Sequence, residues 1–534
     1  MSRRSQVAGV LLALAVVGVG CKRNKDEGGG APGRAKAGAG AVGGQGVLLA
    51  EGAVEDLRVT ADGQFVSYLV KTQKPRMDGI PPQMRLGEAH VVPVSGGVPR
   101  KLGDGVTNVP GGLLFTPDSR HVLFLTGYNV AAQSGVLHVL SLSEPTAEPV
   151  KLGEAVTYFL PSPDGSKLAY VDGGVLKLGP LPSGPFRQVG GEVSTADFAP
   201  DGSMLFFKRK LAAAGGLAAV SVADEKAPPR KLADGVGDYE LSSDSKRVAY
   251  QVRSDGGRGL YDLFIADLPE LKPRQVSTGT SAFAFSPDAQ WLARNEGGKP
   301  EQLGDLYVGP ASGAPGRKVG ERVRELSFSP DSKALGFLAK YDQSAGAGLM
   351  GVVTLPDGEP KLVGNRVPNF TWGKDGRYVA FLSRFLKPIY SVDLMVYPVG
   401  AEKAEKAHPG VFGYGFAPEN AALVFRSNCI RDGRACDFKA LPLPLQPQHQ
   451  AQTWMEGIYS FKLSEDGQRV LATYARTDSD AYDVAVYDVK TQARKTLDQG
   501  IQLPAFFAGK DDSLAVYVVK TGAQPGIYVA PASP

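Results

Sequence analysis

One phrase recurs along most of this chain: an apolar stretch, a turn built on an acidic residue, and a second apolar stretch. Clear copies run from Phe198 to Gly202 (FAPDG), Phe285 to Ala289 (FSPDA) and Phe328 to Ser332 (FSPDS). Successive copies lie about 44 residues apart, and self-similarity at such a period indicates a repeat architecture. We number the copies repeats 1 to 11 by their anchor residues, which are Asp62, Asp118, Asp164, Asp201, Asp244, Asp288, Asp331, Asp375, Glu419, Asp466 and Asp511.

Each repeat contains four runs of strand length, rich in β-branched and aromatic residues and separated by turn residues. In the turn, Pro presets φ, Asp caps the backbone through its side chain, and Gly accepts positive φ, so the turn joins two adjacent antiparallel strands. We name the four strands A to D, with the anchor turn between A and B. Four-stranded units in series predict an all-β fold, a β-propeller of about eleven blades.

The repeats resemble the TolB-type WD40-like (PD40) propeller repeat. The shared features are the Phe-Ser-Pro-Asp turn, the apolar triplet after it, and a later Asp-Leu-Tyr run, as at Asp305 to Tyr307. The resemblance covers residues 46–534 and implies a propeller. It implies little about function, because the shared residues are turn and core residues.

Eleven blades exceed the four to eight that are usual for one ring. We therefore expect two packed rings, with a possible boundary near residue 275, and keep a single large ring as the alternative. The last repeat shows no strand D run after Gly526 to Ala530. We expect residues Gly46 to Glu51 to supply that strand, because a closing strand would remove two exposed edges.

The N-terminal region differs in composition from the repeats. Residues 1–20 carry Arg3 and Arg4 before an apolar core, which predicts a lipoprotein signal peptide with Cys21 as the lipidated residue. Ordinary signal cleavage and an uncleaved anchor are the alternatives. Residues 21–45 are mostly Gly, Ala and charged residues and predict a flexible tether. Lys22 rather than Asp follows Cys21, which favours an exported protein anchored at the outer membrane or cell surface of a bacterium.

The chain has two cysteines besides Cys21. Cys429 and Cys436 flank a connection between strands B and C around Asp432 and Gly433. We expect them to form a disulfide in an oxidising compartment. A zinc pair is the competing interpretation, but it would need two further ligands, and no His lies nearby in the sequence.

No catalytic constellation is recognisable. The anchor carboxylates repeat with the fold and are expected to be turn residues, the five His are scattered, and no Gly-x-Ser-x-Gly motif occurs. We therefore expect no catalytic, cofactor-binding or metal-binding residues and no enzyme. The formal charge is +4, and only +2 once Arg3 and Arg4 leave with the signal, so nucleic acid is not expected as a partner.

The connections between strands B and C vary widely, so the face that carries them is the candidate binding surface. Basic residues stand at the exit of strand B, at Lys71, Lys210, Arg253, Lys340, Arg384 and Lys520, with Arg294, Arg426 and Arg476 nearby. They could form a positive ring that attracts an anionic partner. Alternatively, several pair with the Asp that opens strand C, as at Asp262, Asp305, Asp393, Asp437 and Asp483.

The long first connection adds three basic residues to Lys71, namely Lys74, Arg76 and Arg85, and these four are the candidate docking residues. The leading hypothesis is a non-enzymatic interaction platform in the cell envelope that binds an envelope protein or an anionic surface polymer. The alternative is an enzyme, or a propeller that binds a small ligand or polysaccharide, with its site in the axial channel. Such a site draws one residue from each blade and leaves no local motif.

Overall fold

The computed structural model describes residues 46–209, 215–254, 260–299, 302–383, 392–430, 435–446, 448–476, 480–520 and 524–534. Cys21, the expected signal peptide and the expected tether lie outside these ranges, as do Lys210 and Arg384. The described chain is all-β apart from two short 3-10 helices, η1 (Pro418–Asn420) and η2 (Lys510–Asp512). The predicted all-β, propeller-like fold is confirmed.

Within the described residues, the strands form eight antiparallel sheets, five of which have four strands in sequence order. Each of these five sheets corresponds to one sequence repeat. They are β2 to β5 (Val54–Val59, Phe65–Gln73, Leu86–Pro93, Arg100–Thr107), β13 to β16 (Val193–Phe198, Met204–Arg209, Leu217–Ser221, Arg230–Ala233), β17 to β20 (Val236–Leu241, Arg247–Arg253, Tyr261–Asp267, Pro273–Ser277), β21 to β24 (Phe283–Phe285, Trp291–Glu296, Asp305–Pro310, Arg317–Gly320) and β25 to β28 (Glu325–Phe328, Ala334–Asp342, Ala347–Thr354, Lys361–Val367).

The other three described sheets have seven strands, and each joins two repeats through one long strand. The long strands are β9, β32 and β39; each is strand D of one repeat and strand A of the next. The sheets are β6 to β12 (Leu113–Phe115, His121–Asn129, Ser134–Ser141, Val150–Pro161, Lys167–Asp172, Val175–Pro180, Arg187–Gly190), β29 to β35 (Phe370–Trp372, Tyr378–Ser383, Val392–Pro398, Glu405–Phe416, Ala422–Ile430, Ala435–Pro442, Gln452–Ile458), and β36 to β41 with β1 (Ser460–Leu463, Arg469–Ala475, Tyr482–Asp488, Arg494–Ala508, Leu514–Val519, Gly526–Pro531, Val47–Glu51).

Strand B of each repeat is buried on both faces. In β7, for example, Val122 to Leu125 are all almost inaccessible to solvent. This burial explains why strand B reads as a continuous apolar run instead of alternating with polar residues. Neighbouring repeats cover the two faces, because the buried apolar side chains gather at the junctions between successive repeats.

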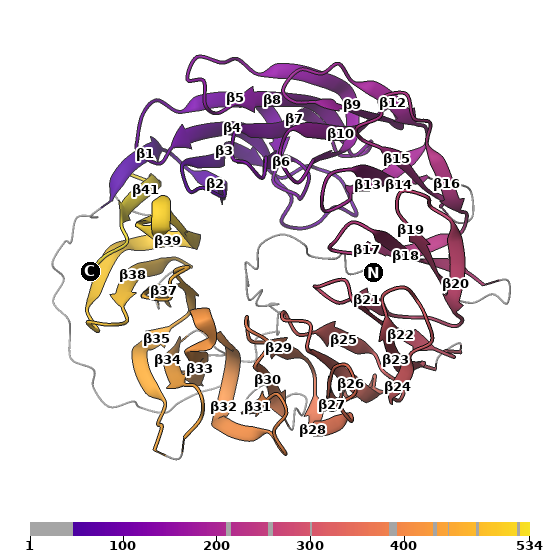
Figure 1. Ribbon diagram of the computed structural model, residues 1–534. Helices are drawn as coiled ribbons and strands as arrows, with labels where there is room; N and C mark the ends of the chain where they lie inside the picture. The colour runs from indigo at the N-terminus through magenta and orange to yellow at the C-terminus, as the bar shows by residue number, and fades with distance from the viewer. Residues whose placement is uncertain are drawn as a thin grey trace.

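The sheets follow one another around a single opening in Figure 1. Strands A such as β2, β17 and β21 border this opening, and strands D such as β5, β20 and β24 lie on the outside. The two packed rings favoured by the sequence are not seen in this arrangement. Near residue 275, the possible ring boundary, Ile265 of repeat 5 and Phe285 of repeat 6 share one buried cluster.

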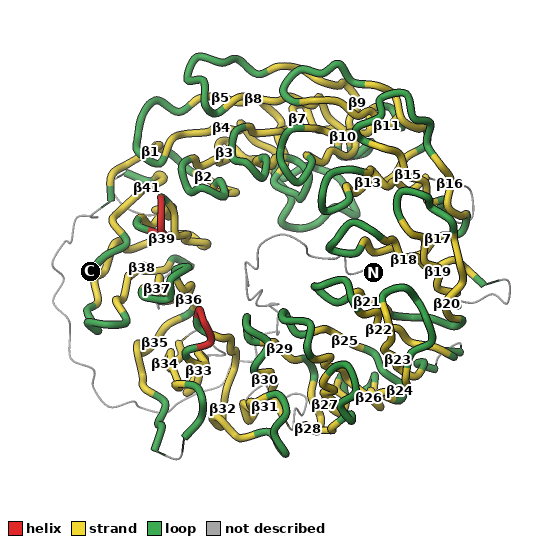
Figure 2. The backbone as a smooth tube through the Cα atoms, in the orientation of Figure 1, coloured by secondary structure: helices red, strands yellow, loops and turns green. Residues whose placement is uncertain are grey.

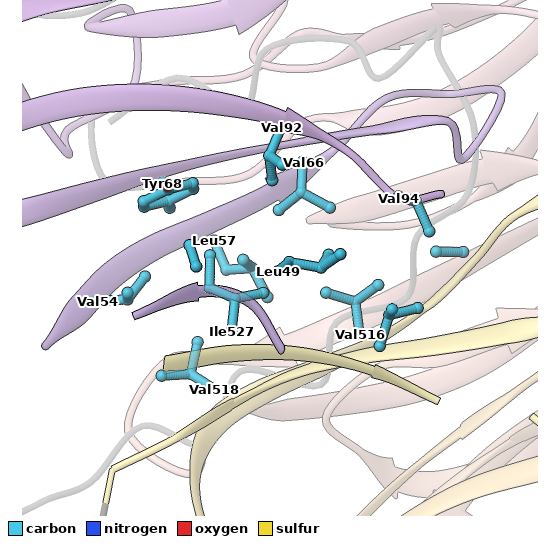
Figure 3. Close-up of a cluster of buried hydrophobic side chains, with 13 residues drawn as sticks. Leu49, Val54, Leu57, Val66, Tyr68, Val92, Val94, Val516, Val518 and Ile527 are labelled. Atoms are coloured by element: carbon cyan, nitrogen blue, oxygen red, sulfur yellow. The ribbon is translucent and has the colours of Figure 1, made fainter. Parts of the chain in front are cut away.

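The first and last described strands pair with each other. Strand β1 lies antiparallel to β41, with Val47 opposite Val529 and Glu51 opposite Gly526. This confirms the expectation that residues from Gly46 to Glu51 supply the missing strand of repeat 11. Figure 3 shows Leu49 of β1 packed among Val66 of repeat 1 and Val516 and Ile527 of repeat 11. The strand therefore joins the two ends of the repeat array through both hydrogen bonds and apolar burial.

Seven of the described anchor turns share one hydrogen-bonding pattern. A Ser or Thr hydroxyl donates to the anchor carboxylate two residues later, as from Thr60 to Asp62 (2.6 Å) and from Ser329 to Asp331 (2.6 Å). In repeats 9 and 11 the turns are η1 and η2, which Figure 2 shows in red. Where the hydroxyl is present, this contact fixes the turn locally, which is why so short a sequence phrase can specify it.

Candidate binding surface

The anchor carboxylates are engaged in the turns themselves. Asp164 accepts hydroxyl hydrogen bonds from Ser162 (2.5 Å) and Ser166 (2.7 Å), which lower its pKa to about 2. Neighbouring turns are also linked, because the backbone N–H of Asp288 donates to the Ser332 hydroxyl of the next repeat (2.9 Å). These contacts give the anchor residues a structural role, as the sequence predicts.

The opposite face carries the connections between strands B and C, and several of them begin with a β-bulge. Lys71 lies in such a bulge with a positive φ of 51°, and Gly127, Lys340 and Asn428 at the corresponding positions have φ of 57°, 46° and 50°. The strand pairing shifts register at each of these places. A bulge changes the direction of the side chain at the end of strand B. The side chains of these residues therefore do not alternate between the two faces of the sheet as those of the strand do.

Lys71 forms an ion pair with strand C of its own repeat. Its Nζ lies 2.7 Å from Glu88 Oε1, and this hydrogen bond is the main cause of a lowered Glu88 pKa, with Lys101 contributing further. Glu88 stands opposite Val70, the position at which other repeats carry the Asp that opens strand C. The sequence prediction considered only Asp at the start of strand C and therefore missed Glu88. Either acidic residue at that position can pair with the cation.

The predicted ion pairs join a basic residue at the exit of strand B to the Asp that opens strand C. One such pair is clearly present, and in other repeats the basic residue has a different partner. Arg476 Nη1 lies 3.2 Å from Asp483 Oδ1, as predicted. Arg294 Nε instead contacts Glu296 Oε1 at 2.8 Å, and Arg426 Nη1 donates to the Tyr459 carbonyl at 2.5 Å. Most of these charges therefore have polar partners within the sheets, which weakens the picture of a continuous positive ring.

Two further basic residues of this set differ from the predicted scheme. The carboxylate of Asp262 accepts a hydrogen bond from Ser254 (2.8 Å), and no ion pair of Arg253 is seen among the described residues. Lys340 Nζ is 4.0 Å from Glu321 Oε2, at the limit for an ion pair. A second cation lies beside the Lys340 connection, because the guanidinium of Arg324 is 4.9 Å from the centre of the Tyr341 ring.

The first connection, residues 74–85, is held firmly at its base; we call it the basic loop. The backbone N–H of Arg85 donates to Asn108 Oδ1 (2.7 Å), and Asn108 Nδ2 donates back to the Gln83 carbonyl (2.9 Å). Arg58 Nη2 in turn donates to the Asn108 carbonyl (3.1 Å), and Met84 is buried. Asn108 belongs to the segment between repeats 1 and 2, so the base of the loop is fixed by the neighbouring repeat.

The candidate docking residues fall into two groups in the structure. Arg85 is half-buried, donates to the carbonyls of Pro82 (3.0 Å) and Met84 (2.9 Å), and so helps to shape the loop. Lys74 and Arg76 are exposed, and neither has an ion-pair partner among the described residues. Between them and the base lies Met77, which is 47% exposed. The tip of the basic loop thus presents two free cations beside an exposed apolar side chain.

Among the ionisable groups on strands that border the opening, Glu240 and Lys462 have large pKa shifts. Burial raises the pKa of Glu240 in β17 to about 7, and its Oε1 accepts the backbone N–H of Phe285 (3.3 Å). Burial lowers the pKa of Lys462 in β36 to about 8, and its Nζ lies 3.8 Å from the centre of the Phe506 ring. The two strands lie on opposite sides of the opening in Figure 2. These groups do not converge on a shared site.

In the part of the chain that the structure describes, no three His, Cys, Asp or Glu side chains come together as metal ligands would. His90 and His138 instead stack on Tyr68 and Phe124, with ring centres 5.4 and 5.5 Å apart. Burial is the main cause of their lowered pKa values. Both rings are packing residues.

Cys429 and Cys436 form the expected disulfide between β33 and β34, with Cα atoms 4.0 Å apart. The zinc alternative is therefore excluded for this pair. Cys21, the expected lipidation site, lies outside the described residues, so lipidation stays a prediction. No helix in the described ranges has the length and apolar content needed to cross a membrane.

No family model matches this chain, and no curated protein matches it either. Similar solved structures include a eukaryotic initiation factor (14% identity, TM-score 0.40), with 64% of this chain and 88% of that one covered. The tricorn protease is 13% identical, with a TM-score of 0.30, and the match covers 90% of this chain and 59% of the protease. A structure from a study of two prolyl endopeptidases is 13% identical, with a TM-score of 0.31, and the match covers 61% of this chain and 54% of that one. This chain thus spans somewhat more than half the length of the two kinds of peptidase.

Two of these three similar structures are peptidases by name, which contradicts the expectation that this chain is not an enzyme. We withdraw that expectation. We assign no reaction in its place, because likenesses with TM-scores of 0.30 and 0.31 carry no argument about chemistry.

Proposed function

We propose that this chain is an exported, lipid-anchored β-propeller that binds an acidic segment of an envelope protein on the basic loop. The observation that carries the proposal is the pair of exposed cations, Lys74 and Arg76, on a loop whose base Asn108 fixes. A fixed loop loses little conformational entropy on binding, so its contacts contribute more fully to affinity. Exposed cations also steer an anionic partner toward the surface.

The partner is proposed to be a protein because of Met77. Its exposed side chain lies beside the two cations, and a flexible thioether suits contact with varied apolar side chains. A polymer that carries only charged groups would make no apolar contact with the Met77 side chain. An acidic segment with a neighbouring apolar residue matches the loop tip in both respects.

We propose that the scaffold behind this loop is one ring of eleven blades resembling the TolB-type repeat. The four-stranded sheets account for one blade each, and the seven-stranded sheets for two each, divided at β9, β32 and β39. The apolar cluster shared by repeats 1 and 11 supports closure of the ring at the same kind of junction as elsewhere. A closed ring would hold the basic loop in a fixed relation to the other connections on its face.

We propose that Cys21 carries the lipid anchor and that residues 22–45 tether the propeller to the outer membrane or cell surface. The apolar stretch before Cys21 and the polar composition after it support this placement. Replacing Cys21 by Ser should move the protein from the membrane fraction to the soluble fraction. Retention of the variant in the membrane fraction would contradict the anchor.

The docking proposal is tested by charge reversal in the full-length, exported protein. The double variant Lys74→Glu/Arg76→Glu should lose at least about tenfold in capture of its crosslinked envelope partner, because two like charges would face the acidic segment. The matched control is Lys246→Glu/Lys333→Glu, which reverses two exposed lysines of the anchor turns on the opposite face.

Capture should be unchanged in the control. Equal capture by both double variants would contradict docking on the basic loop. Recovery of a polysaccharide instead of a protein, lost on the same charge reversal, would keep the site and contradict the class of partner.

A further inference from the structure

One position of strand B holds a large buried aromatic side chain in nearly every repeat. It lies six residues after the anchor and points toward the preceding repeat, where it joins the apolar cluster of that junction. The aromatic residues are Tyr68, Phe124, Tyr170, Phe207, Tyr250, Phe337, Phe381, Phe425 and Tyr517.

Repeats 6 and 10 depart from this pattern, with Arg294 and Ala472 in place of the aromatic residue. At Ala472 the space is occupied by neighbours, because Phe438 and Phe461 pack in the same cluster with ring centres 3.9 Å apart. At Arg294 the junction is not fully packed, although the arginine side chain itself is buried. A cavity of about 390 Å³ lies there, at the junction of repeats 5 and 6.

Arg294 is enclosed in this junction. It is 2% exposed, its Nε is held by Glu296 Oε1 at 2.8 Å, and its Nη1 is buried without a hydrogen-bond partner among the described residues. A buried N–H of a charged group without an acceptor is costly, so an acceptor from outside the chain, either water or a ligand, would stabilise it. Arg294 also lines the cavity, so a small rotation of its guanidinium would bring this covered donor to a ligand there.

The rest of the wall is suited to a flat group. In repeats 1 and 5, the aromatic residue stacks on its strand C neighbour, as Tyr68 does on His90 and Tyr250 on Phe264. In repeat 6 that neighbour is Tyr307, which lies opposite Arg294 in the sheet and also lines the cavity. Val276 and Pro315 add apolar surface to the wall, so the cavity is bordered by groups that can pack against a ring.

The charge at the cavity favours an anion. The Arg294 side chain is 3% exposed and the Glu296 side chain 30%, so water screens the carboxylate more than the guanidinium. A second cation lies close, because a Cβ built on the lining residue Gly313 would be 3.4 Å from Arg274 Nη1. Arginine recognises carboxylates well, because its donors match their planar geometry.

We propose that the cavity between repeats 5 and 6 is a binding site for a small planar carboxylate. Its carboxylate accepts a hydrogen bond from Arg294 Nη1, and its flat group packs against Tyr307 and the apolar wall formed by Val276 and Pro315. This site lies in a junction within the ring and not on the basic loop, so it is independent of the proposed docking function.

Benzoate is the probe that tests the site, with titration of the full-length protein followed by NMR or calorimetry. Saturable binding is expected, at least about tenfold tighter than for benzamide, which has the same shape without the charge. Arg294→Phe restores the residue type of the other repeats and should abolish binding while raising the melting temperature. Arg120→Phe, a matched change at an exposed arginine, should alter neither.

A second variant keeps the test informative if Arg294→Phe fails to fold. Glu296→Gln removes the carboxylate that competes for the guanidinium and should tighten benzoate binding, a result that a purely structural role of Arg294 does not predict. Equal affinity of the parent protein and either variant at Arg294 or Glu296 would overturn the proposal. So would the absence of saturable benzoate binding to the parent protein, or equal affinity for benzamide.

Discussion

The two faces of the ring differ in how strictly the repeats agree. On the face of the anchor turns, the same hydroxyl–carboxylate contact recurs, as in Ser242 to Asp244 (2.7 Å) and Ser464 to Asp466 (2.5 Å). On the face of the B to C connections, lengths, charges and partners differ from repeat to repeat, and the basic loop occurs once. The comparison teaches that one face maintains the ring while the other is free to acquire binding residues.

The largest expected effect is the difference in lost stability between truncating a side chain in a packed junction and truncating one in a loop. Phe381→Ala should lower the free energy of unfolding by about 4 kcal/mol, because it leaves a cavity in a fully buried junction. Met77→Ala in the basic loop should change it by less than about 0.5 kcal/mol. Denaturant unfolding measures both values, and similar losses at the two positions would break the comparison.

A smaller loss of stability is expected on removing the disulfide that closes one connection on the variable face. Replacing Cys429 and Cys436 by Ser should lower the free energy of unfolding by about 2.5 kcal/mol, because a short loop is no longer closed in the unfolded chain. The same variant should leave partner capture unchanged if docking is on the basic loop. Loss of capture would move the binding surface toward repeat 9.

The inner strands provide a test through pH. Burial raises the pKa of Glu240 from its ordinary value of 4.5 to about 7, so the folded protein holds this proton more tightly than the unfolded chain. The free energy of unfolding therefore falls as the pH rises between these two values. Glu240→Gln should stabilise by about 2 kcal/mol at pH 8 and by almost nothing at pH 4. Equal stabilisation at both pH values would show that the carboxyl is not enclosed.

The smallest effect compares one acidic residue on each face. Asp331→Ala removes the acceptor for the Ser329 hydroxyl and the Lys333 N–H and should cost about 1 kcal/mol. Asp78→Ala, in the exposed part of the basic loop, should cost less than about 0.5 kcal/mol. Thermal unfolding of the two variants side by side gives the comparison, which fails if the loop variant is the less stable.

Much of the fold was predictable because its determinants are local. The anchor turn depends on an acidic residue with Ser, Thr, Pro or Gly close by in sequence, and the closing strand was expected because repeat 11 shows no strand D run. The number of rings was not predictable, since it depends on a small rotation at every junction that no residue pattern encodes. The preference for two packed rings rested on usual blade numbers and not on any residue of this chain.

In the candidate sites, too, the features set by local sequence were predicted, and those set by contacts between distant residues were not. Cys429 and Cys436 pair as predicted, because a short connection brings two antiparallel strand ends together. The partner of Lys71 was missed because Glu88 replaces the usual Asp. The role of Asn108 could not be predicted, because it holds the basic loop from a neighbouring repeat. Arg294 was visible as a break in the aromatic pattern, but its cavity needed the structure.

The most direct test of binding on the variable face is site-specific photocrosslinking in cells. A photoreactive residue placed at Met77 should form a covalent adduct with an envelope protein, because this side chain is exposed at the tip of the basic loop. The same residue placed at Lys246, exposed on an anchor turn, should form none. Adducts from Lys246 alone, or no adduct from Met77, would contradict the account.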